Sequence, residues 1–352
     1  MSPLLGFSFF SDLDFARLQI LLKKYSPEQV WTSFTAQDLQ QLRLKPPRSE
    51  EILRFRDTFA PATYQDRLRL KNITALDYYA PEYPALLKEI YDPPLVLYKK
   101  GALGLAGCSG LAVVGTRHPD SYGRQATADI VRALGRNTIV SGMALGIDTA
   151  AHQAALETSL PTIAVLGTPV DNCYPADNQE LYERIIKEGA ILSEYPPGAP
   201  YTRWSFPRRN RIITGLSRAV FVIEGRLTSG ALISGKIALE QNREVYALPG
   251  QLGNPLAEGP NWLIAQGARP IYDLNQLCLE LGGSQLSLDF PRPVYTLTAQ
   301  EDQIYARIPA DGTIAMDTLL ENFEFGHLSK TLLQMEIKGL ISILPGKQVI
   351  RI

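Results

Sequence analysis

Cysteine and histidine are scarce in this chain, which limits the chemistry that it can support. The 352 residues include three cysteines and three histidines, and no two cysteines form a Cys-x-x-Cys pair. This composition argues against a disulfide scaffold and a zinc site, and it suits a reducing cytosol. We therefore expect no bound metal and a cytoplasmic location.

An excess of charge of one sign is also missing. The chain has 35 Lys and Arg against 36 Asp and Glu, for a formal net charge of −1. Any nucleic-acid binding must therefore come from a local basic patch. The apolar residues 1–10 have no cationic segment before them, and Asp12 and Asp14 follow. We expect neither a signal peptide nor a transmembrane helix, and hence no membrane partner.

Changes of pattern along the chain predict three parts. Apolar residues at helical spacing, such as Phe15, Leu18 and Leu22, indicate a small helical domain over residues 1–62. The Tyr- and Pro-rich residues 78–100 are interpreted as a linker that runs along the next domain. We place the central domain at residues 63–290 and the last one at 291–352.

Short apolar runs alternate with helical stretches from residue 111 onward. This alternation predicts an α/β fold with a doubly wound, mostly parallel sheet that has helices on both faces. In such a sheet the ligand crevice lies beyond the carboxyl ends of the strands, where glycine turns follow most of these runs. The expected strands are 111–114, 138–140, 162–166, 190–192, 219–223, 244–248 and 270–272.

The final part has the pattern of a winged helix. Helices are expected near residues 301–307, 316–322 and 329–338, followed by a hairpin that turns at Pro345-Gly346. From residue 291 on there are six Lys and Arg against seven Asp and Glu. Because a groove reader needs positive charge, this balance favours a protein-interaction or regulatory module.

Three glycine loops follow the first predicted strands. In Gly115-Thr116-Arg117 the backbone can approach a ligand closely, and the arginine is suited to a phosphate. In the second loop, which begins at Ser141-Gly142, we expect Asp148 to cap a helix and His152 to be a packed helix residue. The third loop holds Asp171, Asp177 and Asn178, which turns and helix caps explain more simply than a metal.

A near match to the phosphate-binding P-loop spans residues 230–237. Ile237 stands where a Ser or Thr would hold magnesium, so we expect no ATP binding of that kind. Ser229 and Gly230 at a helix start can still bind one phosphate through backbone N–H groups. No nucleophile elbow, H-E-x-x-H or paired-carboxylate motif is evident. We nominate no catalytic residue and no cofactor.

Residues 206–217 read Phe-Pro-Arg-Arg-Asn-Arg-Ile-Ile-Thr-Gly-Leu-Ser, and they are the most informative segment. Between Glu194 and Glu224 the chain has arginines but no acidic residue. Pro207 is expected to open a helix, which would place several guanidinium groups at its positive end. Beside them, Phe206 and Trp204 offer aromatic faces of the kind on which nucleic-acid bases stack.

Taken together, these segments resemble the bacterial DNA-processing protein A family, also called DprA or Smf. The resemblance is strong over about residues 77–272, and the matching pieces run in the order that the family has. The segments on which the resemblance rests are Val113–Arg117, Ser141–Asp148 with His152, Thr162–Gly167 with Tyr174-Pro175, Ser193–Pro196, Phe206–Ser217, Ser229-Gly230, Arg243–Gly250 and Leu263–Ala268.

The resemblance implies a Rossmann-like core that binds and protects single-stranded DNA, helps to load the RecA recombinase in natural transformation, is usually dimeric and is not an enzyme. The family's DNA pocket uses the arginine of the first glycine loop, here Arg117. It also uses a basic residue three positions before Phe206, here Arg203, where many members have Lys. Gly235 stands where many members have a larger side chain. The expected DNA-binding residues are Gly115, Thr116, Arg117, Ser141, Gly142, Arg203, Phe206, Arg209, Asn210, Arg211, Ser229, Gly230 and Lys236.

Two other functions stay open on the sequence. A phosphoribohydrolase acting on nucleotides in the same crevice would carry a Pro-Gly-Gly-x-Gly-Thr loop, which Pro249–Asn254 does not match. A duplex-DNA regulator working through the winged helix would need a more basic tail.

Overall fold

The structure of the chain is a computed structural model that describes residues 3–281, 297–309, 312–321, 323–338, 340–344, 346 and 348–351. It divides into two compact units, Met1–Leu288 and Asp289–Ile352, and each is described by itself. Within the described residues, no helix has the length and apolar character needed to cross a membrane.

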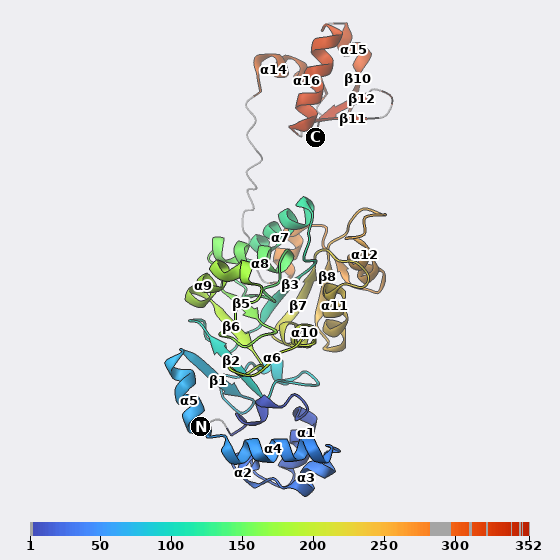
Figure 1. Cartoon of the computed structure of the whole chain (residues 1–352). Helices are drawn as coiled ribbons and strands as arrows, with labels where there is room; N and C mark the ends of the chain where they lie inside the picture. The colour runs from blue at the N-terminus through green and yellow to red at the C-terminus, as the bar shows by residue number, and fades with distance from the viewer. Residues whose placement is uncertain are drawn as a thin grey trace. The chain divides into compact units, whose positions relative to one another are not determined.

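A mixed α/β sheet organises the first unit. Nine strands of the described residues form it in the order β1-β2-β6-β5-β4-β3-β7-β8-β9. Figure 1 labels β1, β2, β6, β5, β3, β7 and β8 of this sheet. From β6 to β9 every neighbouring pair is parallel, and β1 and β2 are antiparallel additions beside β6. The strands are β1 (Ile73–Asp77), β2 (Val96–Lys100), β3 (Gly110–Val114), β4 (Ile139–Ser141), β5 (Thr162–Val165), β6 (Ala190–Ser193), β7 (Ser217–Val222), β8 (Glu244–Ala247) and β9 (Arg269–Pro270).

This strand order has a topological switch point. The chain starts the parallel sheet at β3, builds β4, β5 and β6 on one side, and then returns to add β7, β8 and β9 on the other. The doubly wound prediction is therefore confirmed, and the seven predicted strands correspond to β3–β9. In folds of this kind the crevice at the carboxyl ends of the two strands that flank the switch is the usual ligand site.

Two buried layers cover the faces of the sheet. Side chains alternate along β3, so that Leu111 and Val113 enter one apolar cluster while Ala112 and Val114 enter the other. On the first face lie α7 (Ser121–Ala133), α8 (Ile147–Glu157), α9 (Gln179–Glu188) and α13 (Leu274–Glu280); on the second lie α6 (Ala85–Lys88), α10 (Ser205–Gly215), α11 (Gly230–Glu240) and α12 (Glu258–Ala265).

The interpretation of residues 78–100 as a linker is wrong. This segment contains α6 and the whole of β2, which pairs with both β1 and β6 inside the sheet. Its prolines, such as Pro84 and Pro94, precede the helix and the strand rather than interrupt them. A proline-rich composition is compatible with a strand when the prolines stay outside the hydrogen-bonded residues.

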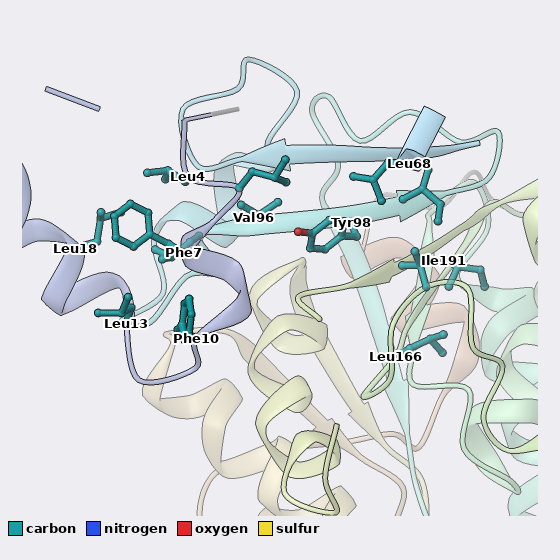
Figure 2. Close-up of a cluster of buried hydrophobic side chains, with 14 of the residues drawn as sticks. Leu4, Phe7, Phe10, Leu13, Leu18, Leu68, Val96, Tyr98, Leu166 and Ile191 are labelled. Atoms are coloured by element: carbon teal, nitrogen blue, oxygen red, sulfur yellow. The ribbon is translucent and has the colours of Figure 1, made fainter. Parts of the chain in front are cut away.

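Within the described residues, five α-helices precede the sheet and pack against its β1–β2 end. Their apolar residues join those of the sheet in one cluster, in which Phe7 and Phe10 lie in the same buried group as Val96, Leu166 and Ile191 (Figure 2). The Ser8 and Tyr98 hydroxyls are hydrogen-bonded at 2.8 Å. A separate domain over 1–62 stays a prediction. The helices are α1 (Phe15–Leu22), α2 (Val30–Ser33), α3 (Ala36–Gln41), α4 (Pro46–Thr58) and α5 (Pro61–Leu70).

In the described residues of the second unit, three helices combine with a small antiparallel sheet. Its elements are α14 (Ala299–Tyr305), β10 (Thr313–Ala315), α15 (Met316–Leu320), α16 (Phe325–Ile337), β11 (Ile341–Leu344) and β12 (Gln348–Arg351). β12 pairs with both β10 and β11. An apolar cluster that includes Leu328 and Leu332 holds the unit together. Asn322, Pro345 and the predicted boundary at 290/291 lie outside the described residues.

Candidate nucleic-acid interface

The arginine-rich segment forms α10, which begins at Ser205. The expectation that Pro207 opens this helix is off by two residues, since Pro207 is the third residue of the first turn. A proline is tolerated there because the first N–H groups of a helix have no partner within it. The arginines of α10 point in different directions and do not gather at its positive end, because Arg209 donates to the Val165 carbonyl while Arg208 and Arg211 pair with carboxylates.

A cavity of about 330 Å³ lies where the carboxyl end of β3 meets the first turns of α10 and α11. Eight of the predicted DNA-binding residues line it, namely Gly115, Thr116, Arg117, Phe206, Arg209, Asn210, Ser229 and Gly230. A second cavity of about 80 Å³ shares Arg117, Phe206 and Arg209 with it and adds Gly142, Leu145, Gly167 and Tyr174. We call the two together the switch-point pocket.

Arg117 is the exposed cation of the switch-point pocket. The loop that carries it is fixed from behind, because the Ile147 N–H donates to the Thr116 carbonyl at 3.1 Å. A side chain at Gly115 would overlap Ile147, so this position requires glycine. Within the described residues, no carboxylate forms a salt bridge with Arg117. Its guanidinium is therefore available to an anion.

Arg209 is a buried cation beneath the same pocket. Its side chain is only 5% exposed, and its Nη1 donates to the Val165 carbonyl at 2.6 Å. Burial lowers the pKa of Arg209, the nearby Asp148 opposes that shift, and Arg117 adds to it. A Cβ at Gly142 would overlap the guanidinium, which explains the glycine there. Arg209 therefore contributes positive potential from below the pocket floor.

Asp148 is expected from the sequence to cap α8, but the structure shows that it does not. Gly146, at a φ of 84°, occupies the position before the helix, and Asp148 lies in the first turn. Its buried carboxylate accepts hydrogen bonds from the Gly142 N–H at 3.2 Å and the Ala144 N–H at 3.4 Å. Burial raises the pKa of Asp148, and Arg209 opposes that shift. Asp148 therefore shapes the second glycine loop and partly balances Arg209.

His152 is a packed helix residue, as expected. Its Nδ1 lies 2.7 Å from the Thr162 hydroxyl, and its side chain is fully buried. Burial lowers the pKa of His152 to about 3, with a further contribution from Arg209. The imidazole is therefore neutral at pH 7. It packs against the first residue of β5, inside the sheet, and does not line the pocket.

Phe206 and Tyr174 form the aromatic wall of the pocket. Their ring centroids are 5.0 Å apart at an angle of 46°. Phe206 packs on Gly167, where an added Cβ would lie 2.8 Å from its ring. Tyr174 is 47% exposed and was not among the predicted site residues. The Tyr-Pro pair within the third glycine loop was the available signal.

The backbone at the start of α11 closes the opposite side. Ser229 is the N-cap, and its hydroxyl accepts from the Leu232 N–H at 3.3 Å. Gly230 is exposed with open space around it. Ala231 and Leu232 are packed helix residues, which agrees with the rejection of a P-loop. Ser141 lies behind the pocket, because its buried hydroxyl donates to the Val113 carbonyl at 2.7 Å.

Three predicted site residues lie away from the switch-point pocket. Arg211 forms salt bridges with Glu194 and, at 3.3 Å, with Asp92. Arg203 is exposed in the turn before α10. Lys236 lies over the Trp262 ring at 4.9 Å. Gly235 does not line the switch-point pocket either, because it packs against Leu263 of α12.

Two acidic residues, Asp120 and Glu224, lie close together beside β7. The sequence did not reveal them as a pair. Glu224 is 3% exposed, and its Oε2 accepts from the Asp120 N–H at 3.3 Å. Burial and the Asp120 carboxyl raise the pKa of Glu224 to about 7. Both residues line a cavity of about 440 Å³ with Asn254 and Tyr122. Within the described residues, no cluster of three metal-ligating side chains exists here or elsewhere.

The family model and the similar proteins all point to the same protein family. A family model for DNA recombination-mediator protein A matches residues 74–282. Protein Smf of Synechocystis sp. is 39% identical over 337 residues, which cover 84% of this chain and 85% of that protein. DNA processing protein DprA of Bacillus subtilis is 41% identical over 216 residues, which cover 60% of this chain and 73% of that protein.

Solved structures agree with the sequence comparisons. The X-ray structure of DprA from Streptococcus pneumoniae matches with a TM-score of 0.69 at 32% identity, covering 80% of this chain and 98% of that one. DNA processing protein A from Helicobacter pylori, described with a single-stranded DNA binding mode, matches with a TM-score of 0.53 at 30% identity. That match covers 59% of this chain and 95% of the H. pylori chain.

Proposed function

The chain belongs to the DNA recombination-mediator protein A family, and from this premise we propose that it binds single-stranded DNA in the switch-point pocket. One observation carries the proposal. An unpaired exposed arginine, a buried arginine and an aromatic pair of exposed Tyr174 and half-buried Phe206 converge at the carboxyl edge of the sheet. Cations suit the phosphates of a strand, and aromatic faces suit its unpaired bases.

The roles within the pocket follow from these placements. Arg117 contacts phosphate directly, and Arg209 attracts it from below the floor. Phe206, supported by Tyr174, stacks on a base. Backbone N–H groups of the first glycine loop and of the α11 start complete the contacts. Arg211 is not assigned a DNA contact, because its guanidinium is engaged by Glu194 and Asp92.

The wider role that we propose is that of a cytoplasmic mediator of recombination. The protein protects single strands, helps to load RecA during DNA uptake and acts as a homodimer, without being an enzyme. The second unit is a winged helix that serves as an interaction or regulatory module. The H. pylori relative's single-stranded DNA binding mode and the match over 59% of this chain support the DNA-binding part of the proposal.

A titration with three ligand classes tests the proposed function. Labelled oligothymidylate should bind in a salt-sensitive way, while a matched duplex should bind much more weakly. A panel of nucleotides should compete poorly, since a mononucleotide reaches few of the contacts. Preference for the duplex, or tight binding of a nucleotide with no binding of the oligothymidylate, would contradict the proposal.

The absence of catalysis is testable with the same protein. We expect no ATP hydrolysis above that of a Lys236→Ala control, because Ile237 replaces the magnesium-binding hydroxyl of a P-loop. We also expect no cleavage of nucleoside monophosphates. Turnover of a monophosphate that Arg117→Ala abolishes would favour the phosphoribohydrolase alternative.

A further inference from the structure

We propose that the cavity lined by Glu224, which we call the Glu224 cavity, binds an uncharged aromatic heterocycle with adjacent N–H donors, of the kind on the Watson–Crick edge of guanine. The cavity shares no lining residue with the switch-point pocket, so this inference goes beyond the proposed function. A free nucleoside and a base of a bound strand are two sources of the same edge.

Glu224 is a buried carboxyl group whose position the packing of the fold does not explain. It is 3% exposed, and within the described residues the Asp120 N–H, 3.3 Å from its Oε2, is the one N–H group that donates to it. No Lys or Arg of those residues forms a salt bridge with it. The chain nevertheless keeps space for this group, because a Cβ at Gly123 would overlap it. A buried carboxyl without a cation that lines a cavity indicates a ligand.

Asp120, the other acidic residue of the cavity, has a structural role. It is the N-cap of α7, and its Oδ1 accepts from the Gly123 N–H at 2.9 Å. That hydrogen bond lowers the pKa of Asp120, so it stays ionised beside Glu224. No Lys or Arg lines the cavity, and the nearby Arg124 donates to the Pro119 carbonyl at 3.0 Å. A phosphate or another anion would therefore be repelled.

Tyr122 and the apolar lining suit a flat ring. Tyr122 is 54% exposed, and its hydroxyl donates to the Pro249 carbonyl at 3.4 Å, so the side chain bridges α7 and the segment after β8. Ile223 and Leu248 add buried apolar surface. An aromatic heterocycle stacks on a tyrosine face and buries its own apolar faces there. A metal ion or a small amine would satisfy the carboxyl but leave this lining uncovered.

The walls of the cavity are fixed by hydrogen bonds within the protein. The Asn261 amide donates to the Gly250 carbonyl at 2.9 Å and accepts from the Gly250 N–H at 3.1 Å. On the other side, the Gly225 N–H donates to the Leu256 carbonyl at 2.7 Å, and the Gly225 carbonyl accepts from the Gly259 N–H at 2.8 Å. The volume of about 440 Å³ suits a small molecule. The cavity also lies beyond the carboxyl ends of β7 and β8, where doubly wound folds bind ligands.

Guanine meets these requirements more fully than other ligands of similar chemistry. The two oxygens of a carboxylate accept parallel hydrogen bonds, and guanine offers N1–H and N2–H side by side. Thymidine and inosine offer a single N–H on the same edge. A guanidinium group offers a parallel pair, but it leaves most of a cavity of this size unfilled.

Calorimetric titration with guanosine, a nucleoside without phosphate, tests the site. It should be done at about pH 8, because Glu224 is ionised above its pKa of about 7. Guanosine should bind more tightly than inosine and thymidine. Glu224→Gln, which puts an NH₂ group against the donors of guanine, should weaken guanosine binding by about tenfold or more. Glu188→Gln, which changes an exposed glutamate at the end of α9, is the matched control.

Tyr122→Ala gives a second variant at an exposed position. It should weaken guanosine binding by about fivefold to 100-fold, the effect of losing one stacking face, while the protein keeps its circular dichroism spectrum. Arg117→Ala, in the switch-point pocket, should bind guanosine as the wild type does.

Two oligomers identify the source of the base. If the strand supplies it, an oligothymidylate with single guanine substitutions should bind the wild type more tightly than plain oligothymidylate, and Glu224→Gln should remove the difference. If the source is a free nucleoside, guanosine should bind while the two oligomers bind equally.

Three results would each overturn the inference: neither guanosine binding nor a guanine preference in the wild type, equal behaviour of Glu224→Gln, or displacement by methylguanidine where guanosine does not bind. Failure to bind plain oligothymidylate, with guanosine still bound, would contradict the proposed function and not this site.

Discussion

At the scale of single residues, the direction in which each arginine side chain of α10 points decides whether it can bind DNA. Arg209 points under the switch-point pocket, while Arg208 and Arg211 point to Glu194 and Asp92 on another side of the same helix. The sequence predicts a basic segment, but not which guanidinium is free. Carboxylates far away in the chain decide that, because a paired arginine has little left to offer a phosphate.

Phe206 tests the stacking role at this scale. Phe206→Ala should reduce the affinity for oligothymidylate by about 1–3 kcal/mol, since one base loses its platform. The ring is also partly buried against Gly167, so some loss of stability is expected. Binding should be measured well below the melting temperature, and melting should be followed by circular dichroism. A variant that melts earlier yet binds with wild-type affinity would assign Phe206 to the core.

Glu224 gives a prediction about pH. Its pKa is raised to about 7 in the fold from an ordinary value of 4.5, so the folded state keeps a proton that the unfolded state releases. The free energy of unfolding should therefore fall as pH rises from about 4.5 through about 7. Asp120 and Tyr122 line its cavity, and the nearby Arg124 opposes the pKa shift. Glu224→Gln should remove this dependence.

Urea unfolding of wild type and Glu224→Gln at about pH 5 and about pH 8 measures the effect. The difference between the two proteins is the informative quantity, because His152 has the opposite influence and is common to both. Its pKa is lowered to about 3, so it costs stability only as the pH falls below its ordinary value of 6.5. If both proteins showed the same pH dependence, Glu224 would be ionised in the folded state throughout this pH range, which would contradict the prediction.

At the scale of elements, α10 separates two functions on its faces. One face carries Phe206, Arg209 and Asn210 to the switch-point pocket. Another carries Arg208, whose Nη1 donates to the Ser11 carbonyl at 3.3 Å and so joins the helix to the N-terminal segment. The helix therefore positions DNA-binding side chains while holding two parts of the unit together.

Arg211→Ala tests this division. Removing Arg211 from this partly buried ion network leaves Glu194 and Asp92 with Arg208 alone, which should cost about 1–3 kcal/mol of stability. The affinity of the folded protein for oligothymidylate should stay within a few-fold of wild type. Arg117→Ala should do the reverse, with near-normal unfolding and weak binding. An Arg211→Ala variant that is fully stable but binds poorly would return Arg211 to the DNA site.

The elements show what the sequence alone can predict. The β3–β9 strands were predictable because most of them are short apolar runs that end in a glycine turn, and these runs also place the pocket. β2 was missed because Pro93 and Pro94 mask the apolar residues that follow them. Tyr174 and the Asp120–Glu224 pair were missed for another reason. Their partners lie 32 and 104 positions away in the chain, and only the fold brings them together.

At the scale of the whole molecule, the chain consists of two units with different surfaces. The first holds the switch-point pocket. On the second, α16 exposes Phe325 and Leu333, at 64% and 55%. An apolar helix face with few cations suits a protein contact better than a phosphate backbone. We therefore expect the second unit to influence assembly or partner binding rather than DNA affinity.

Deleting residues 293–352 tests this expectation. Affinity for oligothymidylate should remain within a few-fold of the full chain, whereas assembly or the effect on RecA should change. Circular dichroism must show that the remaining core is folded. A loss of a hundredfold or more by a folded core would mean that the second unit binds the DNA.

The salt dependence of oligothymidylate binding in Arg117→Ala tests the central claim most directly. The logarithm of affinity should fall linearly with the logarithm of salt concentration for every variant. Its slope should be smaller by roughly 0.7 in Arg117→Ala, the value for one lost phosphate contact on a single strand. Arg54→Ala, which removes an arginine that is 82% exposed on α4, should keep the wild-type slope and affinity. An Arg117→Ala variant that matches wild type in both would place the single strand outside the switch-point pocket.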